Sequence, residues 1–113
     1  MSVDTQLVAE IKEQLNDDIL SFAWMAQIAR LLKPGRNKID CIGSVLDSVV
    51  ELCNDGFIVV GPTRETNGMI FIDAWPDREL GLRARLEFEI AKYGGTQDQD
   101  FCFWIQRTAD HAK

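Results

Sequence analysis

Regularly spaced carboxylates are the side chains of this sequence best suited to bind a charged partner. They fall seven, four and four residues apart in a stretch that contains no lysine or arginine. At about 100° per residue, this spacing places them with Ser44 along one line of a helix. Carboxylates accept strong hydrogen bonds from lysine and arginine side chains. The members of this acidic line are Asp40, Asp47, Glu51 and Asp55.

Three interpretations of the acidic line are open: a solvated face without function, a face that binds a protein, and a face that reads DNA. The line lies opposite the apolar stripe of the helix, so we expect it to face solvent. Asp17 and Asp18 follow the first predicted helix, residues 4–15, and can join a protein-binding face. A DNA-reading face would set several acids against phosphates, which disfavours that interpretation.

Basic residues keep the DNA interpretation in consideration. A recognition helix makes its first contacts at its N-terminus, and a wing can add a phosphate contact. The same side chains can instead pair with acids of the following helix. The candidate DNA-binding residues are Arg36, Asn37, Lys38 and Arg64, the last near the tip of a predicted hairpin.

Groups suited to catalysis or metal binding are sparse. His111 is the single histidine, and the three cysteines lack the paired spacing of a zinc site. Cys41 and Cys53 would lie about 18 Å apart on one helix, too far for a disulfide. Neither a glycine-rich phosphate loop nor a nucleophile with a nearby base is evident. We therefore expect a protein that is not an enzyme, uses no cofactor or metal, and keeps its cysteines reduced and buried.

Charge is unevenly distributed along the chain, which has 113 residues and a formal net charge of −6. Residues 30–38 carry four bases and no acid, whereas residues 1–29 carry five acids and one base. Such an acidic surface disfavours nucleic acid and anionic membranes and favours a basic protein partner. No apolar run is long enough to span a bilayer, and the first residues do not resemble a secretory signal. We expect a cytoplasmic protein without membrane contact.

Apolar periodicity and turn residues predict the elements. Asp4 and Ser21 are plausible helix N-caps, and Asn67-Gly68 signals a hairpin turn. The fourth helix has apolar residues on more than one face, so we expect it to pack on two sides. The predicted helices cover residues 4–15, 22–33, 38–54 and 76–93. The predicted hairpin strands cover residues 57–61 and 69–75, and a last strand covers residues 100–108. Ile19-Leu20 is either a short strand or the lead into a helix.

This order predicts one α+β domain over residues 1–113 that is winged-helix-like. It comprises three helices and a two-stranded β-hairpin wing, with an appended C-terminal helix and strand. From residue 54 to 108, the patterns DGFIVVG, IDAW, PDRELGLRARLEFEI and DFCFWIQRT resemble a family of small bacterial proteins.

In size and acidity, the chain also resembles immunity proteins of contact-dependent inhibition and related polymorphic toxin systems. Those proteins are cytoplasmic, bind one cognate toxin and block it. We therefore expect a non-enzymatic inhibitor, a monomer or weak dimer, that covers the active cleft of a basic, nuclease-type toxin with the acidic line. The alternative is a winged helix-turn-helix DNA-binding transcriptional regulator that dimerises through the fourth helix. A third possibility is a subunit of a larger assembly that docks through the edge of the strand at residues 100–107.

Overall fold

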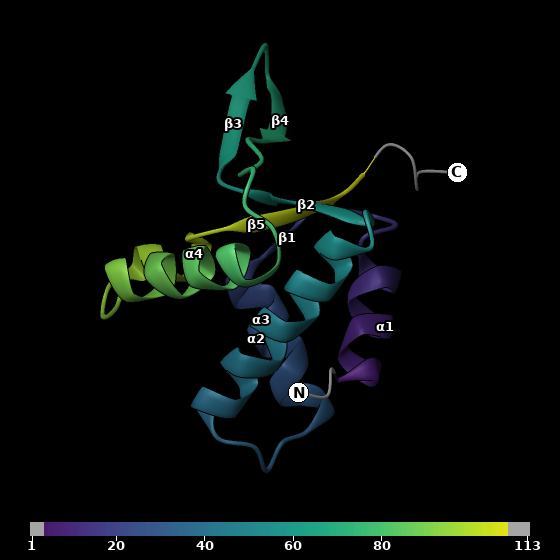
Figure 1. Cartoon of the computed structure of the whole chain (residues 1–113), viewed down its shortest axis with the longest axis vertical. Helices are drawn as coiled ribbons and strands as arrows, with labels where there is room; N and C mark the ends of the chain where they lie inside the picture. The colour runs from purple at the N-terminus through teal and green to yellow at the C-terminus, as the bar shows by residue number, and fades with distance from the viewer. Residues whose placement is uncertain (1–3, 109–113) are drawn as a thin grey trace.

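The computed structural model describes residues 4–108 and has an α+β fold in which helices pack against a three-stranded antiparallel sheet, from which a two-stranded hairpin projects (Figure 1). Within those residues, the α-helices are α1 (Thr5–Gln14), α2 (Phe22–Leu32), α3 (Lys38–Asn54) and α4 (Glu79–Lys92). The strands are β1 (Leu20–Ser21), β2 (Ile58–Gly61), β3 (Thr63–Thr66), β4 (Met69–Ile72) and β5 (Trp104–Arg107), and a short 3-10 helix, η1, spans Gln97–Phe101.

The first three helices begin at polar caps. Asp4, Ser21 and Asn37 each accept a hydrogen bond from the backbone N–H three residues later, at 3.2, 3.2 and 2.8 Å. Each bond satisfies a donor that the first turn of a helix leaves unpaired. The predicted caps Asp4 and Ser21 are therefore confirmed, Asn37 is a third cap that was not predicted, and the predicted bounds of these three helices hold to within one residue.

Strand β5 is the centre of a three-stranded antiparallel sheet. Ile105 lies opposite Leu20 of β1 on one side and opposite Val60 of β2 on the other. The prediction that residues 57–61 pair with the returning strand of a hairpin is wrong, because β2 pairs with β5 instead. The chain turns at Pro62, which has no N–H to extend the ladder. The predicted last strand over residues 100–108 is shorter, since residues 100 and 101 belong to η1. Strand β2 covers one edge of β5 along its length, and β1 covers the other edge at Trp104 and Ile105, so the continuous free edge predicted over residues 100–107 is not present.

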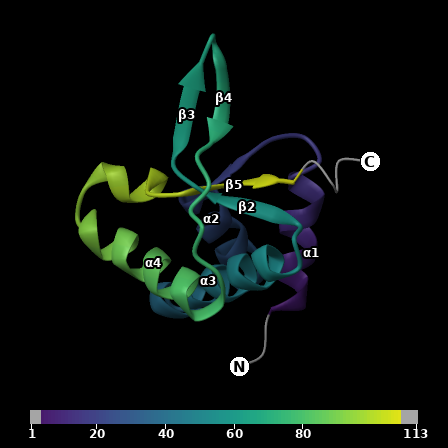
Figure 2. The ribbon, with the colours of Figure 1, turned by 45° about the horizontal axis from the view of Figure 1, so that its top comes forward.

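The predicted hairpin turn is confirmed, but its first strand is β3, which lies in the predicted connection rather than in residues 57–61, and its second strand, β4, is shorter than the predicted residues 69–75. Asn67 and Gly68 both have positive φ, at 54° and 79°, as a tight two-residue turn requires. The turn joins β3 to β4, and Thr66 lies opposite Met69. Figure 2 shows this hairpin standing away from the helices and the three-stranded sheet. Its strands are largely exposed on both faces.

Helix α4 starts later than predicted and packs on one side only. Its buried residues are Leu82 and Leu86. Leu80 is 85% exposed and Phe88 is 61% exposed, so the prediction of packing on two sides is wrong. The helical period places the exposed pair opposite the buried pair. Among the helices and strands of residues 4–108, α3 and η1 make the closest contacts with this helix.

One hydrophobic cluster joins α1, α2, α3, α4 and the three-stranded sheet. Cys41, Cys53 and Cys102 are all buried as free thiols, which confirms their predicted packing role. None of the helices in residues 4–108 is both long enough and apolar enough to cross a membrane.

The thiol of Cys102 predicts a pH dependence of stability. Burial raises its pKa from 9.0 to about 11, with a smaller contribution from the nearby carboxylate of Glu89. Above pH 9 the unfolded chain therefore loses this proton while the folded chain keeps it, so the free energy of unfolding falls as pH rises towards 11. In urea titrations between pH 8 and pH 10.5, the native protein should lose stability more steeply than the Cys102→Ala variant. Parallel pH profiles would contradict this.

Candidate functional site

A groove lies between the C-terminal half of α3 and the first turns of α4. Its volume is about 450 Å³. Four carboxylates and one guanidinium line it, which gives the groove a net negative charge. The lining residues are Asp47, Val50, Glu51, Asn54, Asp55, Glu79, Leu80 and Arg83.

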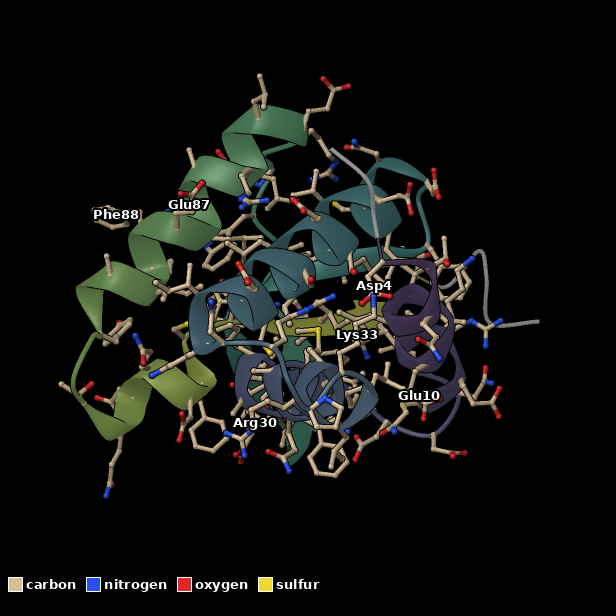
Figure 3. The ribbon with its side chains drawn as sticks, turned by 90° about the horizontal axis from the view of Figure 1, so that it is seen from below. Asp4, Glu10, Arg30, Lys33, Glu87 and Phe88 are labelled. Atoms are coloured by element: carbon tan, nitrogen blue, oxygen red, sulfur yellow. The ribbon has the colours of Figure 1, made fainter. Side chains whose placement is uncertain are left out.

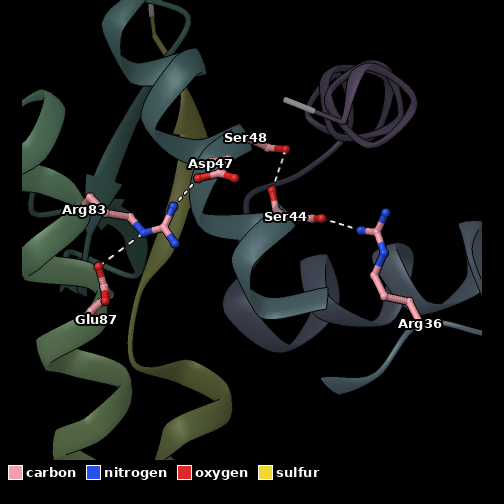
Figure 4. A network of polar contacts seen from close by, with 6 residues as sticks. All are labelled: Arg36, Ser44, Asp47, Ser48, Arg83 and Glu87. Carbon is pink, nitrogen blue, oxygen red and sulfur yellow. Dashed lines mark hydrogen bonds and ion pairs between the residues drawn. The ribbon is translucent and has the colours of Figure 1, made fainter. Parts of the chain in front are cut away.

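Arg83 ties the two helices together at one end of the groove (Figure 4). Its guanidinium contacts the carboxylate of Asp47 on α3, and its Nε donates to Oε1 of Glu87 at 3.3 Å. The side chain of Asp47 is only 17% exposed. Within residues 4–108, Glu51, Asp55 and Glu79 form no ion pair, so their charges stay available to a partner.

The expectation that the whole acidic line faces solvent is wrong at its centre. Asp40, Glu51 and Asp55 are exposed, but Ser44 and Asp47 are half-buried. The hydroxyl of Ser44 accepts a hydrogen bond from Arg36, and its carbonyl accepts one from Ser48 at 2.8 Å (Figure 4). The middle of α3 is therefore tied to the α2–α3 turn on one side and to α4 on the other.

The structure brings three of the six predicted acids together and leaves three apart. Asp47, Glu51 and Asp55 line the groove. Asp40 lies in the first turn of α3, at the far end of that helix. Asp17 and Asp18 lie in the connection between α1 and β1 and line other hollows of the surface.

The three lining residues from α4, which are Glu79, Leu80 and Arg83, were not among the predicted site residues. Their contribution depends on how α4 packs on α3, and Arg83 is 36 residues from Asp47 in sequence. The alternation of charge along ELGLRARLEFEIAK was the available signal, since it is typical of a helix with ion pairs on its surface.

The four candidate DNA-binding residues do not form one surface. Arg36 forms an ion pair with Asp4 at 3.6 Å. Lys33 binds the same carboxylate at 3.5 Å (Figure 3). Asn37 is the cap of α3, and Lys38 begins that helix. Arg64 lies on the hairpin, at the opposite end of the molecule from the α2–α3 turn (Figure 1), so the prediction that it joins the others is wrong.

Further exposed aromatic and apolar side chains lie outside the groove. Phe101 is 57% exposed and stacks on Trp104, with ring centroids 5.6 Å apart. Met69 on the hairpin is 62% exposed. No group of three or more metal-ligating side chains comes together in the part of the chain that the structure describes.

Comparisons of this chain with protein-family models, with curated proteins and with solved structures give no match. The geometry of the site is therefore the basis for a functional proposal.

The pair formed by Arg83 and Asp47 should show measurable coupling. In a double-mutant cycle with Arg83→Ala and Asp47→Ala, we expect a coupling energy of about 1 kcal/mol, because both side chains are partly shielded from water. The matched control is the more exposed pair Arg85 and Asp77, which lies at 3.2 Å and should couple more weakly. Urea unfolding of the variants gives both values. Equal coupling of the two pairs would contradict a special role of Arg83 in joining α3 to α4.

Proposed function

We propose that this chain is a non-enzymatic inhibitor that binds a basic protein through the groove between α3 and α4. In its specific form, the proposal is a cytoplasmic immunity protein that neutralises a cognate nuclease-type toxin by covering its active cleft. The observation that carries it is the set of carboxylates around one groove, Glu51, Asp55 and Glu79, that no base of residues 4–108 neutralises.

Charge complementarity is the physical reason for a nuclease as the partner. A cleft that binds nucleic acid presents lysine and arginine to phosphates. Carboxylates on a second protein can occupy the same positions, which speeds encounter and fixes orientation. Leu80 at the rim of the groove adds an apolar contact beside the charges, since its side chain is 85% exposed.

We propose further that the fold is a variant of the winged helix. The order α1, β1, α2, α3, β2 with a small antiparallel sheet supports this, and the hairpin β3–β4 takes the place of the wing. In this variant, α4 lies against α3, the helix that would enter a DNA groove. The position of α4 supports a protein partner over DNA, because Arg83 covers the middle of α3 where a recognition helix would contact bases.

The test is capture with the immobilised chain from its native cells, followed by assay of the eluted protein. We expect a basic protein with nuclease activity, and we expect one equivalent of the free chain to inhibit that activity. Elution of duplex DNA by salt would support the regulator instead. A captured nuclease that keeps full activity in the presence of excess chain would overturn the inhibitor proposal.

A further inference from the structure

Helix α4 presents a stripe of apolar side chains to solvent, on the face opposite its buried residues. Leu80, Ala84, Phe88 and Ala91 follow one another at intervals of four, four and three residues, so they share one face of the helix. All four are exposed. Figure 3 shows Phe88 pointing away from the rest of the molecule.

The order of side-chain sizes in this stripe is self-complementary. Ala84 is small and stands four residues from Leu80 on one side and four residues from Phe88 on the other. If two copies of α4 cross antiparallel at Ala84, then Leu80 of each copy meets Phe88 of the other. The small side chains at the crossing point allow the helix axes to approach to about 8 Å.

The charges of α4 also favour a second copy as the occupant. The helix contains three acids and three bases and is therefore neutral, although the chain as a whole carries −6. Two acidic molecules can meet at this helix without the repulsion that other faces would create. In the antiparallel arrangement, Arg83 of one copy lies within about 3 Å, along the helix axis, of the level of Glu87 of the other copy. The side chain of Glu87 is 60% exposed and can accept a second ion pair.

We infer that this face of α4 is a homodimer interface in which two copies pack antiparallel about a two-fold axis at Ala84. The stripe is one helix wide, so the interface is at the low end of specific interfaces, at or below roughly 1,200 Å² in total. We expect a weak dimer, with a dissociation constant on the order of micromolar. Leu80 and Arg83 are shared with the groove, whereas Ala84, Phe88 and Ala91 are not, so variants at those three positions test the dimer without altering the groove.

Cross-linking at two alanines of the same helix tests this geometry. Ala84→Cys places thiols at the two-fold axis, within disulfide reach. Ala91→Cys is the matched control, because antiparallel packing separates its two copies by about 21 Å. Under mild oxidation, Ala84→Cys should form covalent dimers at least about tenfold faster than Ala91→Cys. The native thiols are buried and do not interfere. Equal rates for the two variants would overturn the antiparallel arrangement.

Measuring dimerisation by analytical ultracentrifugation of glutamate variants tests whether the apolar stripe of α4 is the dimer surface. Phe88→Glu should weaken dimerisation by at least about tenfold, because it places two carboxylates against apolar partners. Met69→Glu on the hairpin should change it by less than about twofold, although Met69 and Phe88 are 62% and 61% exposed. Loss of the dimer in Met69→Glu but not in Phe88→Glu would move the interface to the hairpin and overturn the inference. A native protein that stays monomeric at concentrations of roughly 500 µM would also overturn it.

Discussion

Replacing Phe103 with alanine should lower the free energy of unfolding by about 4 kcal/mol. Phe103 is fully buried, and its ring contacts that of Phe22 with centroids 5.2 Å apart. Its carbonyl also accepts a hydrogen bond of 3.1 Å from the backbone N–H of Phe22, where α2 begins. The alanine variant leaves a cavity where α2 meets the segment before β5, and the loss approaches the total stability of a small domain. Urea unfolding measures it.

Phe101 provides a matched control two residues away. It is 57% exposed and contacts Trp104 rather than the core. We expect Phe101→Ala to lower the free energy of unfolding by less than about 1 kcal/mol, since most of its ring is already in water. If the two alanine variants were equally destabilised, the assignment of Phe103 to the core and Phe101 to the surface would be wrong.

The parts of the fold that follow from local chemistry could be predicted from sequence. Asp4 and Ser21 are caps because a side-chain oxygen before a helix accepts from its first N–H groups. Asn67-Gly68 forms a turn because both residues tolerate positive φ. These features depend on a few adjacent residues, so tertiary contacts do not change them.

The partners of each element could not be predicted, because they depend on residues far apart in sequence. Nothing within residues 57–61 distinguishes pairing with the next strand from pairing with β5, which follows more than forty residues later. For the same reason, the acidic line gave no sign that Asp47 would bind Arg83. The apolar residues of α4 indicated a helix packed on two sides, since sequence alone does not show whether a second surface is present to cover Leu80 and Phe88.

Reversing two groove charges should weaken binding of the partner by at least about a hundredfold, or roughly 2.7 kcal/mol. The variant carries Glu51→Lys and Asp55→Lys, which replace two unpaired carboxylates at the end of α3 with bases. Both substitutions should leave the folded state stable, because cations are favourable at a helix C-terminus. Titration calorimetry against the captured nuclease measures the loss, and the effect should shrink as salt concentration rises.

The control for this experiment changes the same amount of charge in another place. Asp17→Lys with Asp18→Lys also moves the formal net charge from −6 to −2, but these residues lie outside the groove. If the groove is the binding site, the control variant should associate a few-fold more slowly, because its net negative charge attracts a basic partner less strongly. Its dissociation rate should be unchanged. If instead both variants lost affinity equally, the partner would respond to the total charge of the molecule, and the groove would have no special role. A control that lost more than the groove variant would place the site at the α1–β1 connection.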